Sequence, residues 1–187
     1  MALLTPQSRA HRADLAELVG VAQRDLGILF RQFDSAAAAR DGLMDVLPRL
    51  TAIYGEAAAT LGADWYDDLR AEAGVRGRFR AIPAETVPRG QTDALARWSV
   101  TPLFAAEPDY PTALLKVSGG VQRLIANSDR ETVRFSSIQD KSARGWVRMG
   151  VGECDWCTQY LDGEVHYVEG YDFQAHDHCN CTAVPAF

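Results

Sequence analysis

The C-terminal stretch of the chain holds the residues whose types and spacing suit metal binding. It contains all four cysteines and three of the four histidines. Two thiols spaced as Cys154-x-x-Cys157 can turn both sulfurs toward one point, and soft ligands further along the chain can close the tetrahedron that Zn²⁺ prefers. The sequence therefore predicts a structural zinc site, and its candidate ligands are Cys154, Cys157, His176, Cys179 and Cys181.

The second group of ligands, His176-Asp177-His178-Cys179-Asn180-Cys181, offers more candidates than one zinc ion needs. A four-thiolate site would use all four cysteines, whereas a three-thiolate site would replace one of the last pair with His176 or His178. Reduced buried thiols and disulfides are the alternatives to a metal, and the redox compartment decides between them. No signal-peptide pattern is visible from Met1 to Pro6, so we expect a non-secreted chain whose cysteines are metal ligands.

Motifs of the common enzyme classes are absent from the sequence. There is no Gly-x-Ser-x-Gly elbow, Walker loop, dinucleotide fingerprint or zinc-deaminase signature. The run His176-Asp177-His178 resembles the core of phage HNH-type endonucleases, which need a further helix carrying Asn and His after that core. The short remainder after Cys181 contains Pro185 and does not supply this helix. We therefore expect no enzyme activity, with a metal-dependent HNH-like nuclease as the alternative.

The overall charge limits the partners of the chain. A net charge of −6 and a pI near 5.2 argue against broad electrostatic binding to nucleic acid or to acidic membranes. A zinc-knuckle adaptor that binds nucleic acid is therefore a weaker alternative. No apolar run approaches the roughly 18 residues that a membrane span needs, so we expect no contact with a membrane.

Apolar residues recur at steps of three and four over most of the chain, which is typical of amphipathic helices. Thr5 and Pro6 suit the start of the first helix, and Pro48 predicts a break or a kink in the second, near Leu47. Ser128 with Glu131 forms a capping box, which predicts the start of the last helix. The expected helices cover residues 6–33, 35–73, 92–104, 112–125 and 128–140, with a punctuated loop at residues 74–90.

Two β-prone runs surround the first cysteine pair. Residues 146–149 alternate as a strand that leads into Cys154. Asp162-Gly163 is a type I′ turn signal, and the run from Val165 to Val168 follows it. The predicted fold is mainly α: a bundle-like helical domain of residues 1–139, followed by a small β-hairpin zinc-knuckle module of residues 140–187.

Several motifs of residues 128–187 follow one another in a recognisable order. They are Arg130-Glu131-Thr132-Val133, Trp146-Val147-Arg148, Cys154-x-x-Cys157, Gly163-x-Val165-x-Tyr167, and His176-x-His178-Cys179-x-Cys181 with Pro185. This order resembles the C-terminal signature of Mu F-like minor head proteins, which are phage head morphogenesis or minor capsid proteins. The chain is similar to the short form found in tailed phages of actinobacteria. The family places a histidine three residues before the first cysteine of its last pair, and His176 fills that position.

The resemblance implies a structural role in a virion. The expected function is that of a low-copy minor capsid protein inside the phage head, near the portal or the inner shell. Its expected partners are the portal and the major capsid protein, with contact to packaged DNA and with no small-molecule substrate. The expected location is the capsid interior, and the host cytoplasm during assembly.

Overall fold

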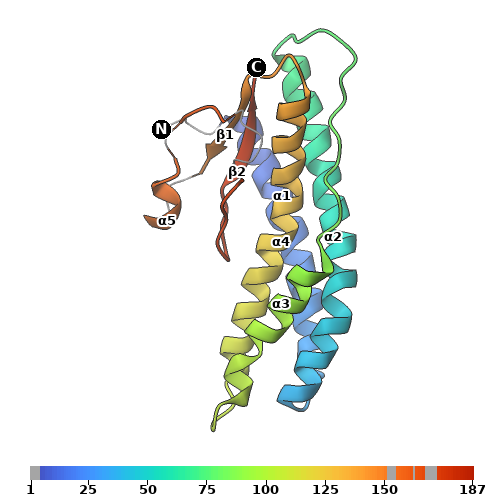
Figure 1. Cartoon of the computed structure of the whole chain (residues 1–187), viewed down its shortest axis with the longest axis vertical. Helices are drawn as coiled ribbons and strands as arrows, with labels where there is room; N and C mark the ends of the chain where they lie inside the picture. Colours follow the sequence, from blue (N-terminus) through green and yellow to red (C-terminus); the bar gives the residue numbers. More distant parts are fainter. Residues whose placement is uncertain (1–4, 151–154, 162, 167–171) are drawn as a thin grey trace.

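Three long helices run side by side and form the body of the computed structural model (Figure 1). They are α1 (Pro6–Phe30), α2 (Ala36–Glu72) and α4 (Tyr110–Gln139), and the shorter α3 (Arg89–Ser99) and the 3₁₀ helix η1 (Thr101–Phe104) pack against α4. The one-turn helix α5 (Asp155–Thr158) and a small sheet lie beside the end of the bundle where α4 finishes. The structure describes residues 5–150, 155–161, 163–166 and 172–187. The predicted fold class, mainly helical with a small β part, is confirmed.

Local sequence sets the start of α1 as predicted. The side-chain oxygen of Thr5 accepts a hydrogen bond from the backbone N–H of Ser8 at 3.1 Å. Pro6 follows at the first helical position, where a missing N–H costs nothing. The apolar stripe is buried at Leu15, Val19, Ala22, Leu26 and Phe30. The helix ends at Phe30, shortly before the predicted end.

The second helix continues through Pro48, so a break there is wrong, while the alternative of a kink stays a prediction. Ser35 begins the helix, since its side chain accepts a hydrogen bond from the N–H of Ala38 at 3.2 Å. Pro48 removes one backbone hydrogen bond, but the neighbouring Leu43 and Leu47 are fully buried against the other helices. Tertiary packing of this face therefore outweighs the local cost of proline.

The helix α4 is also continuous, so the predicted boundary at Ser128 is wrong. Asp109 begins the helix, accepting from the N–H of Thr112 at 2.9 Å. Ser128 lies in the helix interior, close to Gly55 of α2. A Cβ added to Gly55 would lie 2.9 Å from the hydroxyl oxygen of Ser128. This close helix crossing favours an unbroken α4 over a local cap. Glu131, the other half of the predicted capping box, pairs instead with an arginine of its own helix.

Gly119 and Gly120 lie inside α4, at two close approaches of other parts of the chain. A Cβ on Gly120 would collide with Leu95 of α3. A Cβ on Gly119 would lie 2.5 Å from Nε2 of His178. Glycine costs a helix about 1 kcal/mol relative to alanine, and here it lets α3 and the C-terminal chain approach α4.

The punctuated loop of residues 74–90 is irregular up to the start of α3, as predicted, and it follows the bundle from one end toward the other (Figure 1). Side chains of two helices hold it: the N–H of Ala81 donates to Asp67 of α2 at 3.1 Å, and the N–H of Ala84 donates to Thr132 of α4 at 2.8 Å. The next helix ends at Ser99, earlier than the expected residue 104, and Pro102 falls in η1.

The sheet pairs β1 (Gly145–Met149) with β2 (Thr182–Ala186) in antiparallel register. The strand at residues 146–149 is confirmed. Of the β-prone run at residues 165–168, His166 forms an isolated antiparallel bridge to Trp146, and Val165 is not in a strand. Residue 162 of the predicted turn and residues 167–168 lie outside the described residues. Trp146 exchanges both backbone hydrogen bonds with His166, at 2.8 and 2.7 Å, so Pro185 opposite it in β2 needs no N–H.

Two buried clusters hold the structure together. The larger lies between the four helices and contains apolar residues of each, among them Leu26, Leu47, Leu95 and Val121. The second joins the C-terminal segment to the bundle, because Trp65, Tyr66 and Val133 of the helices pack with residues of the segment that include three cysteines. The boundary expected between residues 139 and 140 stays a prediction. Among the described helices, none combines the length and apolar character of a membrane span.

Candidate metal centre

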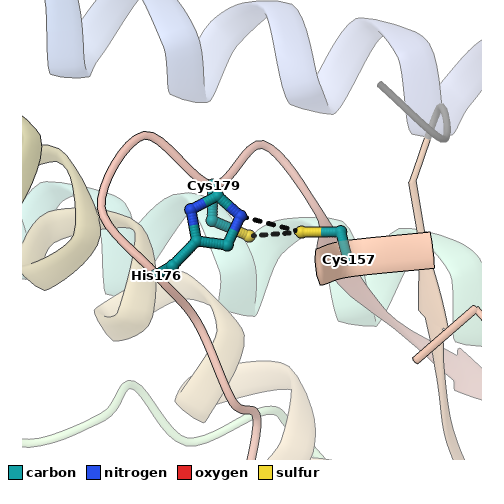
Figure 2. A group of neighbouring side chains, drawn as sticks. All are labelled: Cys157, His176 and Cys179. Carbon is teal, nitrogen blue, oxygen red and sulfur yellow. Dashed lines mark hydrogen bonds between the residues drawn. The ribbon is translucent and has the colours of Figure 1, made fainter. Parts of the chain in front are cut away.

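Three of the predicted ligands meet at one point. The sulfur of Cys157 lies 3.1 Å from Nε2 of His176 and 3.6 Å from the sulfur of Cys179. Figure 2 shows the imidazole and the Cys179 thiol both directed at the Cys157 sulfur. The three ligand atoms lie within 4.8 Å of one another, so this cluster can hold a metal ion.

Two short pieces of backbone bring these side chains together. Cys157 sits in the single turn of α5, where the sulfur is buried while the neighbouring residues reach solvent. His176 and Cys179 flank a tight reversal, closed by a hydrogen bond from the N–H of Cys179 to the carbonyl of His176 at 3.2 Å. Within this reversal, the backbone of His178 is in the left-handed region, at φ 62°. Histidine adopts this conformation more readily than most residues.

The ring of His176 is oriented for ligation through Nε2. Its Nδ1 contacts the backbone carbonyl of Asp177, and a carbonyl can only accept a hydrogen bond. The ring proton therefore resides on Nδ1, which leaves the lone pair of Nε2 facing the Cys157 sulfur. Histidine ligands of metals are typically held in this way by a hydrogen bond from the other ring nitrogen.

The thiols around the cluster influence one another's protonation. A hydrogen bond from Cys181 and the nearby charge of Arg130 lower the pKa of the Cys179 thiol to about 4. The same hydrogen bond, together with burial, raises the pKa of the Cys181 thiol. Burial also raises the pKa of the Cys157 thiol. The described cysteines are free thiols, and one of them already favours the thiolate form that binds metals.

Arg148 of β1 lies against the sulfurs, although it was not among the predicted site residues. Its terminal nitrogen is 3.7 Å from the Cys157 sulfur and 3.6 Å from the Cys179 sulfur, within reach of N–H···S hydrogen bonds. A second nitrogen donates to the backbone carbonyl of Gln174. The guanidinium carbon also lies 4.3 Å from the centroid of the Phe173 ring, so a cation–π contact covers its other face.

Arg130 of α4 holds the ligand-bearing turn, the reversal between His176 and Cys179 with the residues that follow it, against the bundle. Its Nε donates to the carbonyl of Cys181 at 2.9 Å, and a terminal nitrogen donates to the carbonyl of Cys179 at 2.7 Å. Arg130 is only 1% exposed, and burial lowers the pKa of its guanidinium. A partly exposed ion pair between Arg123 and Asp177, at 2.8 Å, supports the same turn from outside.

The structure places the other predicted ligands as follows. Cys181 is buried beside Cys179, and a Cβ on Gly150 would come within 2.7 Å of its sulfur, but it is not part of the three-residue cluster. Cys154 lies outside the described residues. His178 is exposed, with its ring directed at Gly119 of α4 and not at the sulfurs.

A sequence signal for Arg148 was available. Residues two apart on a strand face the same side of a sheet, so the strand that buries Trp146 must also bury Arg148. A buried arginine in a strand next to a cysteine pair indicates an anionic partner. Arg130 begins one of the motifs that carry the family resemblance, but no residue pattern indicated its partners, because they are backbone carbonyls far along the chain.

The donor set fits a zinc ion. Bonds of about 2.3 Å in a tetrahedral site separate two sulfurs by roughly 3.8 Å, close to the 3.6 Å between Cys157 and Cys179. Two thiols and one imidazole are soft ligands that suit zinc better than magnesium or calcium. The site thus has three ligands in place, and a fourth would come from Cys181 or from Cys154.

Comparison with known proteins supplies the family. No curated protein and no solved structure matches the chain at a significant level. The model of the VG15 protein family, by contrast, matches residues 5–187, which include the helical bundle, the sheet and every candidate ligand. The chain therefore belongs to the VG15 protein family, a family of phage proteins.

Proposed function

We propose that this chain is a minor capsid protein of a tailed phage, present at low copy inside the head, where it takes part in head morphogenesis near the portal or the inner shell. The match of residues 5–187 to a phage protein family carries this proposal. The resemblance of residues 128–187 to Mu F-like minor head proteins adds the position in the head. The proposed partners are the portal and the major capsid protein, with contact to the packaged DNA.

We also propose that the Cys/His cluster binds zinc for a structural purpose. Structural zinc sites are closed by protein ligands, whereas catalytic sites keep one position open to water. Here Cys157 and Cys179 are 4% and 2% exposed, and Arg148 covers the sulfurs. A closed site of this kind stabilises the C-terminal module.

The arrangement of the His-Asp-His run supports a non-enzymatic role. A nuclease of this type would direct these side chains at one metal and one phosphate. Instead, His176 faces Cys157, Asp177 pairs with Arg123, and the ring of His178 lies on Gly119. The three side chains point to three different neighbours.

The location of the chain tests the virion role. Mass spectrometry of purified, DNA-filled particles of the phage that encodes it should detect this chain at far lower copy than the major capsid protein. The reason is that a portal-associated protein occupies a single vertex of the head, so its copy number is far below that of the protein that forms the whole shell. Its absence from heads, or a copy number that equals that of the shell, would contradict the minor-capsid assignment.

The absence of nuclease activity is a separate expectation. The purified chain with Mg²⁺, Mn²⁺ or Zn²⁺ should leave supercoiled and linear DNA intact on agarose gels, since the three side chains do not converge. Cleavage that persists through repurification and disappears in the His178→Ala variant would establish the nuclease alternative instead.

A further inference from the structure

Arg148 is a buried cation without a carboxylate partner among the described residues. Arg148 is only 5% exposed, and none of the ion pairs in the described part of the chain includes it. Arg70 of α2 differs in this respect, since it pairs with Asp140 at 2.8 Å. A buried charge without a counter-charge is costly, so the environment of Arg148 must supply a negative charge in another form.

The sulfurs are the groups that can supply this charge. One terminal nitrogen of Arg148 contacts the sulfurs of both Cys157 and Cys179, at 3.7 and 3.6 Å. Arg148 also hydrogen bonds to the Cys181 side chain, a third sulfur. Its other contacts are a backbone carbonyl and the faces of Trp156, Tyr160 and Phe173, none of which carries a full charge. The guanidinium therefore requires a net negative charge on the sulfur cluster.

The number of thiolates in the ligand set decides that charge. Zn²⁺ with two thiolates and two imidazoles is neutral, with three thiolates and one imidazole it carries one negative charge, and with four thiolates it carries two. Arg148 is the guanidinium in hydrogen-bond contact with these sulfurs, and its single charge balances the second arrangement, while the nearby Arg130 donates to backbone carbonyls. His176 already provides the single imidazole, and its Nε2 is directed into the cluster.

We propose that Arg148 is the counter-cation of a zinc site with three thiolates and His176, and that its N–H···S hydrogen bonds to Cys157 and Cys179 position these ligands and set the affinity for the metal. This inference rests on the proposed zinc site. It assigns a positioning role to a residue that does not itself touch the ion. Groups that hydrogen bond to metal ligands typically change metal affinity by about 10- to 100-fold when they are removed.

The experiment measures zinc affinity of the full chain by competition with a chromophoric chelator. Arg148→Met removes the charge and the donors but keeps an apolar stem of similar length, and Arg148→Lys keeps the charge without the planar fork. Arg144→Met is the matched control, because Arg144 is exposed and donates to the carbonyl of Phe187. We expect a loss of about 10- to 100-fold for Arg148→Met, a smaller loss for Arg148→Lys, and no change for the control.

A second measurement reports on the sulfurs directly. With Co²⁺ in place of Zn²⁺, the thiolate-to-metal charge-transfer band should shift in Arg148→Met and stay in place in Arg144→Met, because N–H···S bonds withdraw charge from the ligands. Unchanged affinity and an unchanged band in Arg148→Met would overturn the proposal, while a wild-type chain that binds no zinc would instead overturn the zinc site. If Arg148→Met loses its helical circular dichroism, Arg148→Lys decides, and wild-type affinity in that variant overturns the role of the two hydrogen bonds.

Discussion

The purified chain is expected to contain one zinc ion, and Cys157→Ser or Cys179→Ser is expected to abolish binding and unfold the C-terminal module. The reason is that the module has a small apolar core of its own, while zinc binding in small modules contributes about 10–16 kcal/mol. The helices have a separate buried cluster, so most of the helicity should remain. Metal analysis under reducing conditions and far-UV circular dichroism measure the two effects.

The same series identifies the fourth ligand. His176→Ala should lose the metal, and only one of Cys154→Ser and Cys181→Ser should do so. His178→Ala is the matched control, since this neighbouring histidine faces α4 and should retain full zinc content. A metal-free wild type that keeps its near-UV circular dichroism and four titratable thiols would rule out the zinc site.

Arg130→Met is expected to lower the free energy of unfolding by about 2–6 kcal/mol, because two buried carbonyls lose their donor and each unpaired group costs about 1–3 kcal/mol. These carbonyls belong to Cys179 and Cys181, so the loss should fall on the contact between the turn and α4. Urea unfolding with zinc in excess, followed by circular dichroism, measures the change.

Arg123→Met is the control for this substitution. Arg123 lies two turns earlier on the same helix and binds the same turn through Asp177, but both side chains are about one-third exposed. Exposed ion pairs of this kind contribute about 0–1 kcal/mol. A loss in Arg130→Met no larger than that in Arg123→Met would contradict the role assigned to Arg130.

Helix faces and helix starts could be predicted from the sequence because they depend on neighbours along the chain. Thr5, Ser35 and the stripe that includes Leu26 are local signals, and the structure confirms them. Helix continuity at Pro48 and at Ser128 could not be predicted, since it depends on which face of another helix packs there. A local stop signal was overridden by tertiary contact in both cases.

The same distinction applies to the candidate site. Cys157, His176 and Cys179 could be predicted because metal ligands need particular side chains at short spacings. The partner of β1 could not, because Pro185 argues against a strand until it is known that Trp146 directs its backbone groups at His166. The role of Arg130 could not be predicted for a similar reason, since its acceptors are main-chain atoms of a distant turn.

The continuity of α4 has a mechanical consequence. At 1.5 Å per residue its 30 residues form a rod of roughly 45 Å. In the first half of α4, Gly120 lets α3 pack close against the helix. In the second half, Arg130 donates a hydrogen bond to the ligand-bearing turn. A helix broken near residue 126 would let these two attachments swivel separately. Because the helix is unbroken, a tilt of α4 imposed through α3 moves the ligand-bearing turn as well.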